Sequence, residues 1–170
     1  ANFAFEWIMK KYNCEAKNII LCGDSAGAHL AASLSNYRLD NQYKCSKTQL
    51  LIYPMIDPSC NSKSQDLFAN GFLLTKESMH RFWSLFRGNI SDDENPYFNL
   101  MHQEDLSNSL DTLIITAGFD PLRDEAEVYA KKLNRSGARV RQLHYPDLFH
   151  GFVNLTGLSC LLYTSPSPRD

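Results

Sequence analysis

The 170-residue chain has the composition of an ordinary soluble globular protein, with 44% hydrophobic residues, 21% charged residues and a net charge of −2. It is about one domain long, its 17 basic and 19 acidic side chains do not suggest a nucleic-acid partner, and it holds no apolar run of the roughly 18 residues that a membrane span needs. The five cysteines have no paired spacing, so they predict reduced thiols and neither a disulfide framework nor a metal site. Reduced thiols and the lack of a signal-like segment favour a cytoplasmic protein. The oligomeric state stays open.

The start of the chain predicts a helix, a strand and a second helix. Four apolar residues have the i, i+3, i+4, i+7 spacing of an amphipathic helix: Phe5, Ile8, Met9 and Tyr12. Residues 18–22 (NIILC) form a short apolar run typical of a buried parallel strand, and residues 26–37 return to helical spacing. The expected apolar face of this second helix consists of Leu30, Leu34 and Tyr37.

The next predicted strand is followed by a long insertion. Residues 49–54 (QLLIYP) predict a strand that proline stops, whereas residues 59–104 are polar and irregular apart from one amphipathic helix. Thr75 can cap that helix, whose apolar stripe consists of Met79, Phe82, Trp83 and Phe86. Such a stripe is either plain core packing or part of a lid over a site at the strand ends, and we favour the lid.

Two further predicted strands enclose a helix. Residues 111–118 (DTLIITAG) and 138–145 (ARVRQLHY) predict the strands. Residues 120–137 predict the helix, because acids occupy its first turn, bases its last turn, and Gly137 follows its end. Its expected buried face consists of Ala126, Tyr129, Ala130 and Leu133.

Strands that alternate with helices predict an α/β fold, with a mostly parallel sheet of about four strands and helices on both faces. In such sheets, ligands bind at the carboxyl ends of the strands. The chain opens inside a helical pattern and stops abruptly, so we expect a piece of a longer protein. In this interpretation residues 1–159 are a partial domain that includes the insertion, and residues 160–170 (CLLYTSPSPRD) are a disordered or non-native tail that resembles a translated sequencing adapter.

A single serine stands between glycines where the first strand gives way to a helix. Residues 23–27 (GDSAG) form a G-x-S-x-G sequence, whose tight strand-to-helix turn holds the serine hydroxyl clear of the backbone. The pattern alone arises by chance, but the apolar strand before it and the helix after it strengthen the interpretation. We predict Ser25 as a nucleophile that needs an adjacent base, with the N–H of Ala26 facing an oxyanion.

Five histidines compete for the role of base. The strand-to-helix turn expects an acid and then a histidine further along the chain, each in a loop after a strand. His29 lies in the following helix and is expected to point away from the site, while His80 and His102 precede the candidate acid. His144 falls inside a strand pattern, where a packed histidine is expected. His150 follows that strand in a loop from which its imidazole can reach the serine, so it is the predicted base.

Asp120 is the predicted acid, because it follows a strand and precedes a proline that keeps it in the loop. The alternative is that Asp120 only caps the next helix, and both roles are compatible. Asp124 and Glu125 lie inside that helix, and Asp147, in the histidine's own loop, is the remaining rival. A carboxylate beside the imidazole would fix its tautomer and stabilise the imidazolium.

Four ordered motifs resemble the hormone-sensitive-lipase-like esterases of the α/β-hydrolase superfamily: GDSAGAHLAA, LIYPMIDPS, ITAGFDPLRDEAEVYAKKL and YPDLFHGF. The resemblance runs from about Phe5 to about Thr156 and implies Ser25, Asp120 and His150 as nucleophile, acid and base. It also implies hydrolysis of small carboxylic esters, of short to medium acyl chains, without metal or organic cofactor. Phe119 and Phe152, which flank the acid and the base in sequence, are the expected substrate contacts.

One departure from the family pattern limits what this chain can do. The family's His-Gly-Gly-Gly oxyanion loop has no counterpart in the 170 residues and would lie upstream of Ala1. One oxyanion donor contributes about 10² to 10³ in rate, so we expect an active parent protein and a nearly inactive 170-residue chain with an exposed strand edge. An amidase or peptidase with the same triad, or a non-catalytic receptor on the same fold, are the alternatives.

Overall fold

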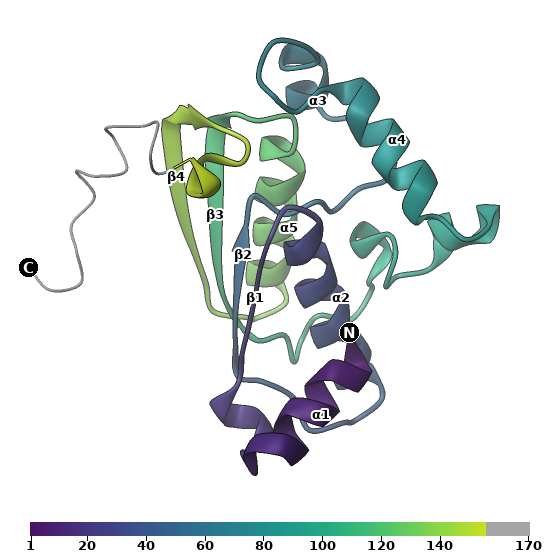
Figure 1. The fold of residues 1–170 in the computed structure, drawn as a ribbon, viewed down its shortest axis with the longest axis vertical. Helices are drawn as coiled ribbons and strands as arrows, with labels where there is room; N and C mark the ends of the chain where they lie inside the picture. The colour runs from purple at the N-terminus through teal and green to yellow at the C-terminus, as the bar shows by residue number, and fades with distance from the viewer. Residues whose placement is uncertain (156–170) are drawn as a thin grey trace, which may run out of the picture.

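The computed structural model describes residues 1–155 and contains a parallel sheet with helices beside it (Figure 1). Its helices and strands in chain order are α1 (Asn2–Tyr12), β1 (Ile20–Asp24), α2 (Ala26–Asp40), β2 (Thr48–Ile52), α3 (Lys63–Leu67), α4 (Lys76–Phe86), β3 (Asp111–Phe119), α5 (Arg123–Arg135) and β4 (Val140–Phe149). Short 3-10 turns lie at Ala16–Asn18, Ile90–Glu94, Leu100–His102 and Phe152–Asn154. The expected tail, residues 160–170, lies outside the described residues.

The sheet has the strand order β1-β2-β3-β4, and each neighbouring pair is parallel. This confirms the predicted α/β class and parallel sheet, and it brings the carboxyl ends of all strands to one edge. β4 continues to Phe149, past the predicted end at residue 145, and its pairing with β3 is irregular between Ala117 and Phe119. The loop after β4 therefore begins directly at His150.

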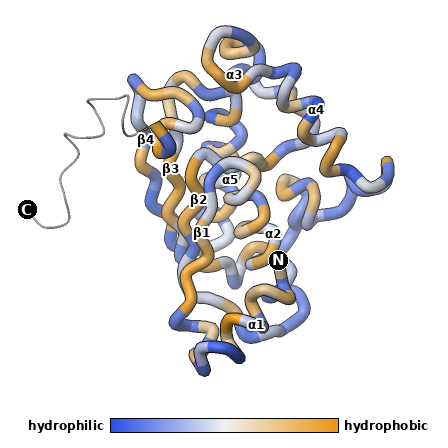
Figure 2. The backbone as a smooth tube through the Cα atoms, in the orientation of Figure 1, coloured by the Kyte–Doolittle hydropathy of each residue, from blue (hydrophilic) through white to orange (hydrophobic). Residues whose placement is uncertain are grey.

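Helices α2 and α5 cover the same face of the sheet, and their buried residues form one core cluster with Leu21, Leu51 and Ile114. The strands follow one another across the sheet in chain order, so each right-handed crossover places its helix on the same side. The described residues thus differ from the expectation of helices on both faces. Alternate residues such as Leu50 and Ile115 face the other side and are half-buried. Figure 2 shows hydrophobic colour along β1, β2 and β3. Such nearly continuous hydrophobic strands are typical of parallel sheets that are buried on both faces.

Helix α2 packs through small residues. Three of its alanines are buried: Ala28, Ala31 and Ala32. Leu30, from the predicted face, is 46% exposed, while Leu34 of the same prediction is buried. The helix lies close to β1, since a Cβ added to Gly23 would stand 2.2 Å from the carbonyl carbon of Gly27. The predicted leucine face is therefore wrong in part. Alanines let α2 approach β1 closely, and a pattern based on large apolar residues does not identify them as the buried face.

The insertion contributes α3 and α4, which lie near the edge where the strands end (Figure 1). The predicted cap is confirmed: the Thr75 side-chain oxygen accepts the N–H of Ser78 at 3.1 Å. The predicted stripe of α4 divides into two parts, because Met79 and Trp83 are buried whereas its two phenylalanines, Phe82 and Phe86, are about half-exposed.

The helix between β3 and β4 matches its prediction. The four residues of its expected face are all buried: Ala126, Tyr129, Ala130 and Leu133. Gly137 follows the helix with φ +95°, the left-handed conformation that glycine adopts past a helix end. Within residues 1–155, no helix is both long and apolar enough to cross a membrane.

Candidate active site

Ser25 occupies the sharp turn between β1 and α2. Its backbone has φ 53° and ψ −119°, a strained conformation for a residue with a side chain, and its N–H donates to the carbonyl of Ile52 at 2.9 Å. The turn aims the Ser25 hydroxyl at the edge where the strands end. The Ala26 N–H lies in the first turn of α2, where backbone N–H groups have no acceptor within the helix.

Two hydrogen bonds join the predicted serine, histidine and aspartate. His150 Nε2 lies 2.9 Å from Ser25 Oγ, and His150 Nδ1 lies 2.8 Å from Asp120 Oδ2. The Asp120 carboxylate is fully buried and His150 is nearly so. An ionised carboxylate only accepts, so Nδ1 carries the proton and Nε2 is free to accept the Ser25 hydroxyl. This arrangement can transfer a proton from the serine to the imidazole.

Asp120 serves two partners with its two oxygens. While Oδ2 faces His150, Oδ1 accepts the N–H of Leu122 at 2.8 Å, and the backbone carbonyl of Asp120 accepts the N–H of Arg123 at 3.1 Å. Helix α5 starts only at Arg123. The capping alternative is therefore wrong in position, because the N-cap of α5 is Leu122, which makes no side-chain cap hydrogen bond, and Asp120 Oδ1 instead organises the turn before the helix. The other oxygen, Oδ2, lies within hydrogen-bond distance of the imidazole.

The rival acids lie elsewhere. Asp147 is exposed to solvent. The Asp124 carboxylate accepts the N–H of Ser64 at 2.9 Å, and the Glu125 carboxylate accepts the N–H of Ile56 at 2.8 Å. Asp124 and Glu125 thus bind backbone groups outside the serine and histidine pair.

Tyr53 supports the imidazole from behind, a contact that the sequence interpretation missed. Its ring centroid lies 4.5 Å from that of His150, and the side chain is 1% exposed. Its hydroxyl lies 3.5 Å from Asp24 Oδ2, which also accepts from Asn154 Nδ2 at 3.1 Å. Burial raises the pKa of Tyr53, with a further contribution from the charge of Asp24. The only sequence sign of this role is the tyrosine's place directly after β2.

An apolar cavity of about 460 Å³ opens beside the serine. Its lining consists of Ser25, Ala26, His29, Leu30, Met55, Phe82, Leu85 and Phe86. Three of these residues come from α4, so the half-exposed side of that helix forms one wall of the cavity. Such a cavity suits an uncharged, largely apolar ligand.

The two expected substrate contacts do not line this cavity. Phe152 is 4% exposed and packs against Tyr53 and Tyr145 in a core cluster behind the imidazole. Phe119 is 39% exposed and stacks on Phe72 at a centroid distance of 5.3 Å. Phe119 points away from the cavity because side chains alternate along the end of β3, and Phe152 does so because of the turn after His150. Being close in sequence to Asp120 or His150 does not bring a side chain into the cavity.

Two other histidines differ from their expected surroundings. His29 does not point away from the site; it lines the cavity, is 1% exposed, and its Nδ1 donates to the Met55 carbonyl at 3.0 Å. Its ring contacts Trp83 and Phe86 edge to face. His144 is exposed rather than packed, with Nδ1 2.9 Å from Thr116 Oγ1, because β4 is the outermost strand of the sheet that residues 1–155 form.

Burial of His29 makes stability depend on pH. Desolvation lowers its pKa to about 4 from 6.5, against the opposing effect of the Met55 carbonyl. As pH falls from 6.5, His29 becomes protonated in the unfolded chain, whereas in the folded chain the buried imidazole stays neutral down to about pH 4. The contribution of His29 to the free energy of unfolding should drop by up to about 3 kcal/mol over this window and then level off. Urea unfolding at several pH values should show it as a pH-dependent difference in stability between the unchanged chain and His29→Asn, because the subtraction removes the effect of other titrating groups; a difference that does not change with pH would contradict the assignment.

A family model described as alpha/beta hydrolase fold matches residues 2–154. Carboxylic ester hydrolase LipN of Mycobacterium tuberculosis is 37% identical over 158 residues, which cover 90% of this chain and 42% of the relative. Ethyl acetate hydrolase of Pseudomonas putida is 28% identical over 156 residues, which cover 89% of this chain and 49% of the relative. The chain spans about half the length of the curated relatives it matches.

Solved structures agree with this likeness. A hyperthermophilic esterase from the archaeon Pyrobaculum calidifontis superposes with a TM-score of 0.87 at 32% identity, covering 94% of this chain and 54% of its own. A thermostable esterase from Pseudomonas putida superposes with a TM-score of 0.85 at 30% identity, covering 93% of this chain and 51% of its own.

Proposed function

The chain belongs to the hormone-sensitive-lipase-like group of the α/β-hydrolase superfamily, and from that premise we propose that it carries the Ser-His-Asp machinery of a carboxylic ester hydrolase. The observation that carries the proposal is the continuous hydrogen-bonded path from Ser25 through His150 to Asp120 beside an apolar cavity. Curated relatives named as ester hydrolases support small esters as the substrate class.

The proposed reaction has two halves that use the same groups. Ser25 Oγ attacks the ester carbonyl carbon while His150 Nε2 takes its proton, and Asp120 stabilises the imidazolium. The carbonyl oxygen becomes an oxyanion near the Ala26 N–H, and the alcohol leaves with the proton from His150. Water, deprotonated by the same imidazole, then attacks the acyl-serine and releases the carboxylic acid and the serine.

In this proposal the 170 residues supply one hydrogen-bond donor to the oxyanion, the Ala26 N–H. The family pattern adds a His-Gly-Gly-Gly loop, which the 170 residues do not contain. Because one donor contributes about 10² to 10³ in rate, we propose that these residues alone turn over slowly and that the protein with this loop is the active esterase. Residues 59–104 are proposed to be the lid, supported by the cavity wall that α4 forms.

The test compares Ser25→Ala with the unchanged serine in a protein that includes the oxyanion loop. We expect hydrolysis of p-nitrophenyl butyrate to fall by about 10⁴ or more, since removal of the nucleophile leaves only binding and oxyanion stabilisation. Mass spectrometry after a phosphonate probe should show one adduct on Ser25 and none in the variant. Ser107→Ala, an exposed serine, is the control.

The alternatives give different results in the same assay. An amidase would turn over the matching p-nitroanilide in a Ser25-dependent way, which an esterase would not do. A non-catalytic receptor would bind ester analogues without turnover or labelling of Ser25. Either result would replace the esterase proposal.

A further inference from the structure

A second buried carboxyl group lies outside the triad, on the first turn of α5. Glu125 is 3% exposed, and its Oε1 accepts two backbone N–H groups, from Ile56 at 2.8 Å and from Asp57 at 3.3 Å. These N–H groups belong to the loop after β2. One side chain of α5 thus holds that loop by its backbone.

The loop held by Glu125 forms part of the cavity beside Ser25. Met55, the residue before Ile56, lines the cavity, and its N–H lies 3.4 Å from the Ser25 carbonyl. Its own carbonyl accepts the Nδ1–H of His29, another lining residue. A shift of the Ile56 backbone would therefore move two cavity walls.

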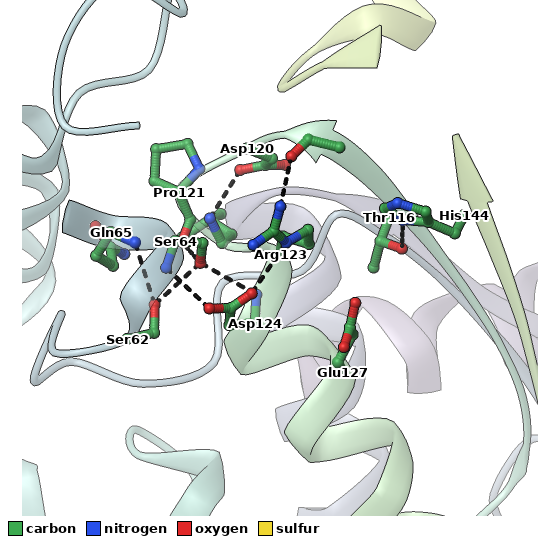
Figure 3. A network of polar contacts seen from close by, with 12 residues as sticks. Ser62, Ser64, Gln65, Thr116, Asp120, Pro121, Arg123, Asp124, Glu127 and His144 are labelled. Atoms are coloured by element: carbon green, nitrogen blue, oxygen red, sulfur yellow. Dashed lines mark hydrogen bonds and ion pairs between the residues drawn. The ribbon is translucent and has the colours of Figure 1, made fainter. Parts of the chain in front are cut away.

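A polar network fixes the insertion to the same helix turn (Figure 3). Ser64 of α3 donates its hydroxyl to the Pro121 carbonyl at 2.6 Å, and its N–H to Asp124 at 2.9 Å. Gln65 Nε2 lies 3.5 Å from Glu125 Oε2, and both Ser64 and Gln65 are fully buried. The loop after β2 is thus joined to the start of α5 through Glu125, and the insertion is joined to it through both Asp124 and Glu125.

We propose that Glu125 is a positioning residue that holds the Met55 loop through its two N–H contacts and so shapes the cavity that receives the substrate. In this proposal the carboxyl group does so while it carries a proton. This inference rests on the proposed ester hydrolysis for the meaning of the cavity. The contacts of Glu125 themselves are independent of the reaction.

The surroundings of Glu125 favour the protonated form. Burial raises the pKa of Glu125 to about 8, against the N–H groups of Ile56 and Asp57 and the Gln65 amide, which act in the opposite direction; the nearby charge of Asp57 adds to the rise. The buried Cys60 thiol and Asp124 are the other ionisable groups near it, and within residues 1–155 no lysine, arginine or histidine forms an ion pair with it. The Gln65 Oε1 has no partner as the amide stands; turning the amide over would let it accept a proton-bearing Oε2.

Two substitutions and one control separate the roles of Glu125. Glu125→Gln keeps an acceptor for the two N–H groups and cannot ionise, while Glu125→Leu removes the acceptor at similar volume. Glu127→Gln makes the same chemical change further along α5, where the Glu127 carboxylate forms an ion pair with Lys131 at 3.9 Å. The Leu variant should raise exchange of the Ile56 and Asp57 amide hydrogens at least tenfold in the 170-residue chain, whereas the Gln variant and the control should not.

The second readout is catalytic, in the protein with the oxyanion loop. For p-nitrophenyl butyrate, Glu125→Leu should raise KM about tenfold, a cost of about 1.4 kcal/mol, with kcat lowered less than about threefold. Between pH 7 and pH 9.5 the KM of the unchanged protein should rise with a midpoint near the carboxyl pKa of about 8, because the ionised form is disfavoured at its buried site. Glu125→Gln should keep the low KM throughout.

Each outcome decides the proposal. Unchanged amide exchange in Glu125→Leu, or a carboxyl carbon that titrates below pH 6 by NMR in the 170-residue chain, would overturn it. If Ser25 proves unreactive, the esterase proposal fails, but exchange and titration still decide the role of Glu125. If Glu125→Leu does not fold, a flat pH profile of the unchanged protein or a Gln variant with raised KM would still reject the inference.

Discussion

Asp120→Asn is expected to lower kcat for ester hydrolysis by about 10³ to 10⁴ in the protein that includes the oxyanion loop. The asparagine keeps an oxygen for the Leu122 N–H but presents an amide NH₂ to His150 Nδ1. The imidazole then carries its proton on Nε2, where it cannot accept the hydrogen of Ser25. Steady-state kinetics with p-nitrophenyl butyrate measures the loss, and KM should change little.

The matched control for this prediction is Asp147→Asn, the same chemical change on an exposed acid near the end of β4. We expect its kcat to stay within about twofold of the unchanged protein, since surface substitutions away from specific contacts have small effects. A similar loss in both variants would show that Asp120 is not the acid partner. A loss confined to Asp147→Asn would reassign the role.

Gly23→Ala is expected to destabilise the fold by about 3 kcal/mol or more, because overpacking here involves backbone that cannot rotate away. The added Cβ would stand 2.2 Å from the carbonyl carbon of Gly27, 2.3 Å from its oxygen and 2.6 Å from the N of Ala28. Strand β1 and helix α2 would have to separate. Ser25 lies between these elements, so its turn would be lost with them.

Gly27→Ala provides the comparison within the same motif. A Cβ there meets only Asp24 Oδ1, at 3.9 Å, so no clash arises. Alanine in a helix is favoured over glycine by roughly 0.5–1 kcal/mol, and the variant should be as stable as the unchanged chain or slightly more stable. Urea unfolding of the 170-residue chain measures both; equal losses would contradict the contact geometry.

The two glycines of the G-x-S-x-G pattern therefore have different structural importance, although the motif treats them alike. Position 23 requires glycine because α2 lies so close to β1 there. Gly27 contributes only the backbone atoms that a side chain at position 23 would meet. Sequence alone suggests small neighbours for Ser25, but it does not tell which glycine a methyl group would exclude.

Local pattern and chain order predict most of what relates Ser25, Asp120 and His150. Each predicted strand exists within a few residues of its expected position, and each of the three residues follows the end of a different strand. Parallel strands end at one edge, so chain order alone predicts their proximity. The structure then brings them within hydrogen-bond distance.

The sequence by itself determined the strand-turn-helix at Ser25, the succession of strands, and the helix of residues 120–137, because these depend on periodicity, turn residues and connection rules that act over short distances. Only the tertiary structure decided which way His29 points, that Tyr53 backs the imidazole, that Phe152 packs in the core, and that Glu125 holds the Met55 loop. These facts depend on which side chains from distant segments share one buried volume, and a one-dimensional pattern does not contain that information.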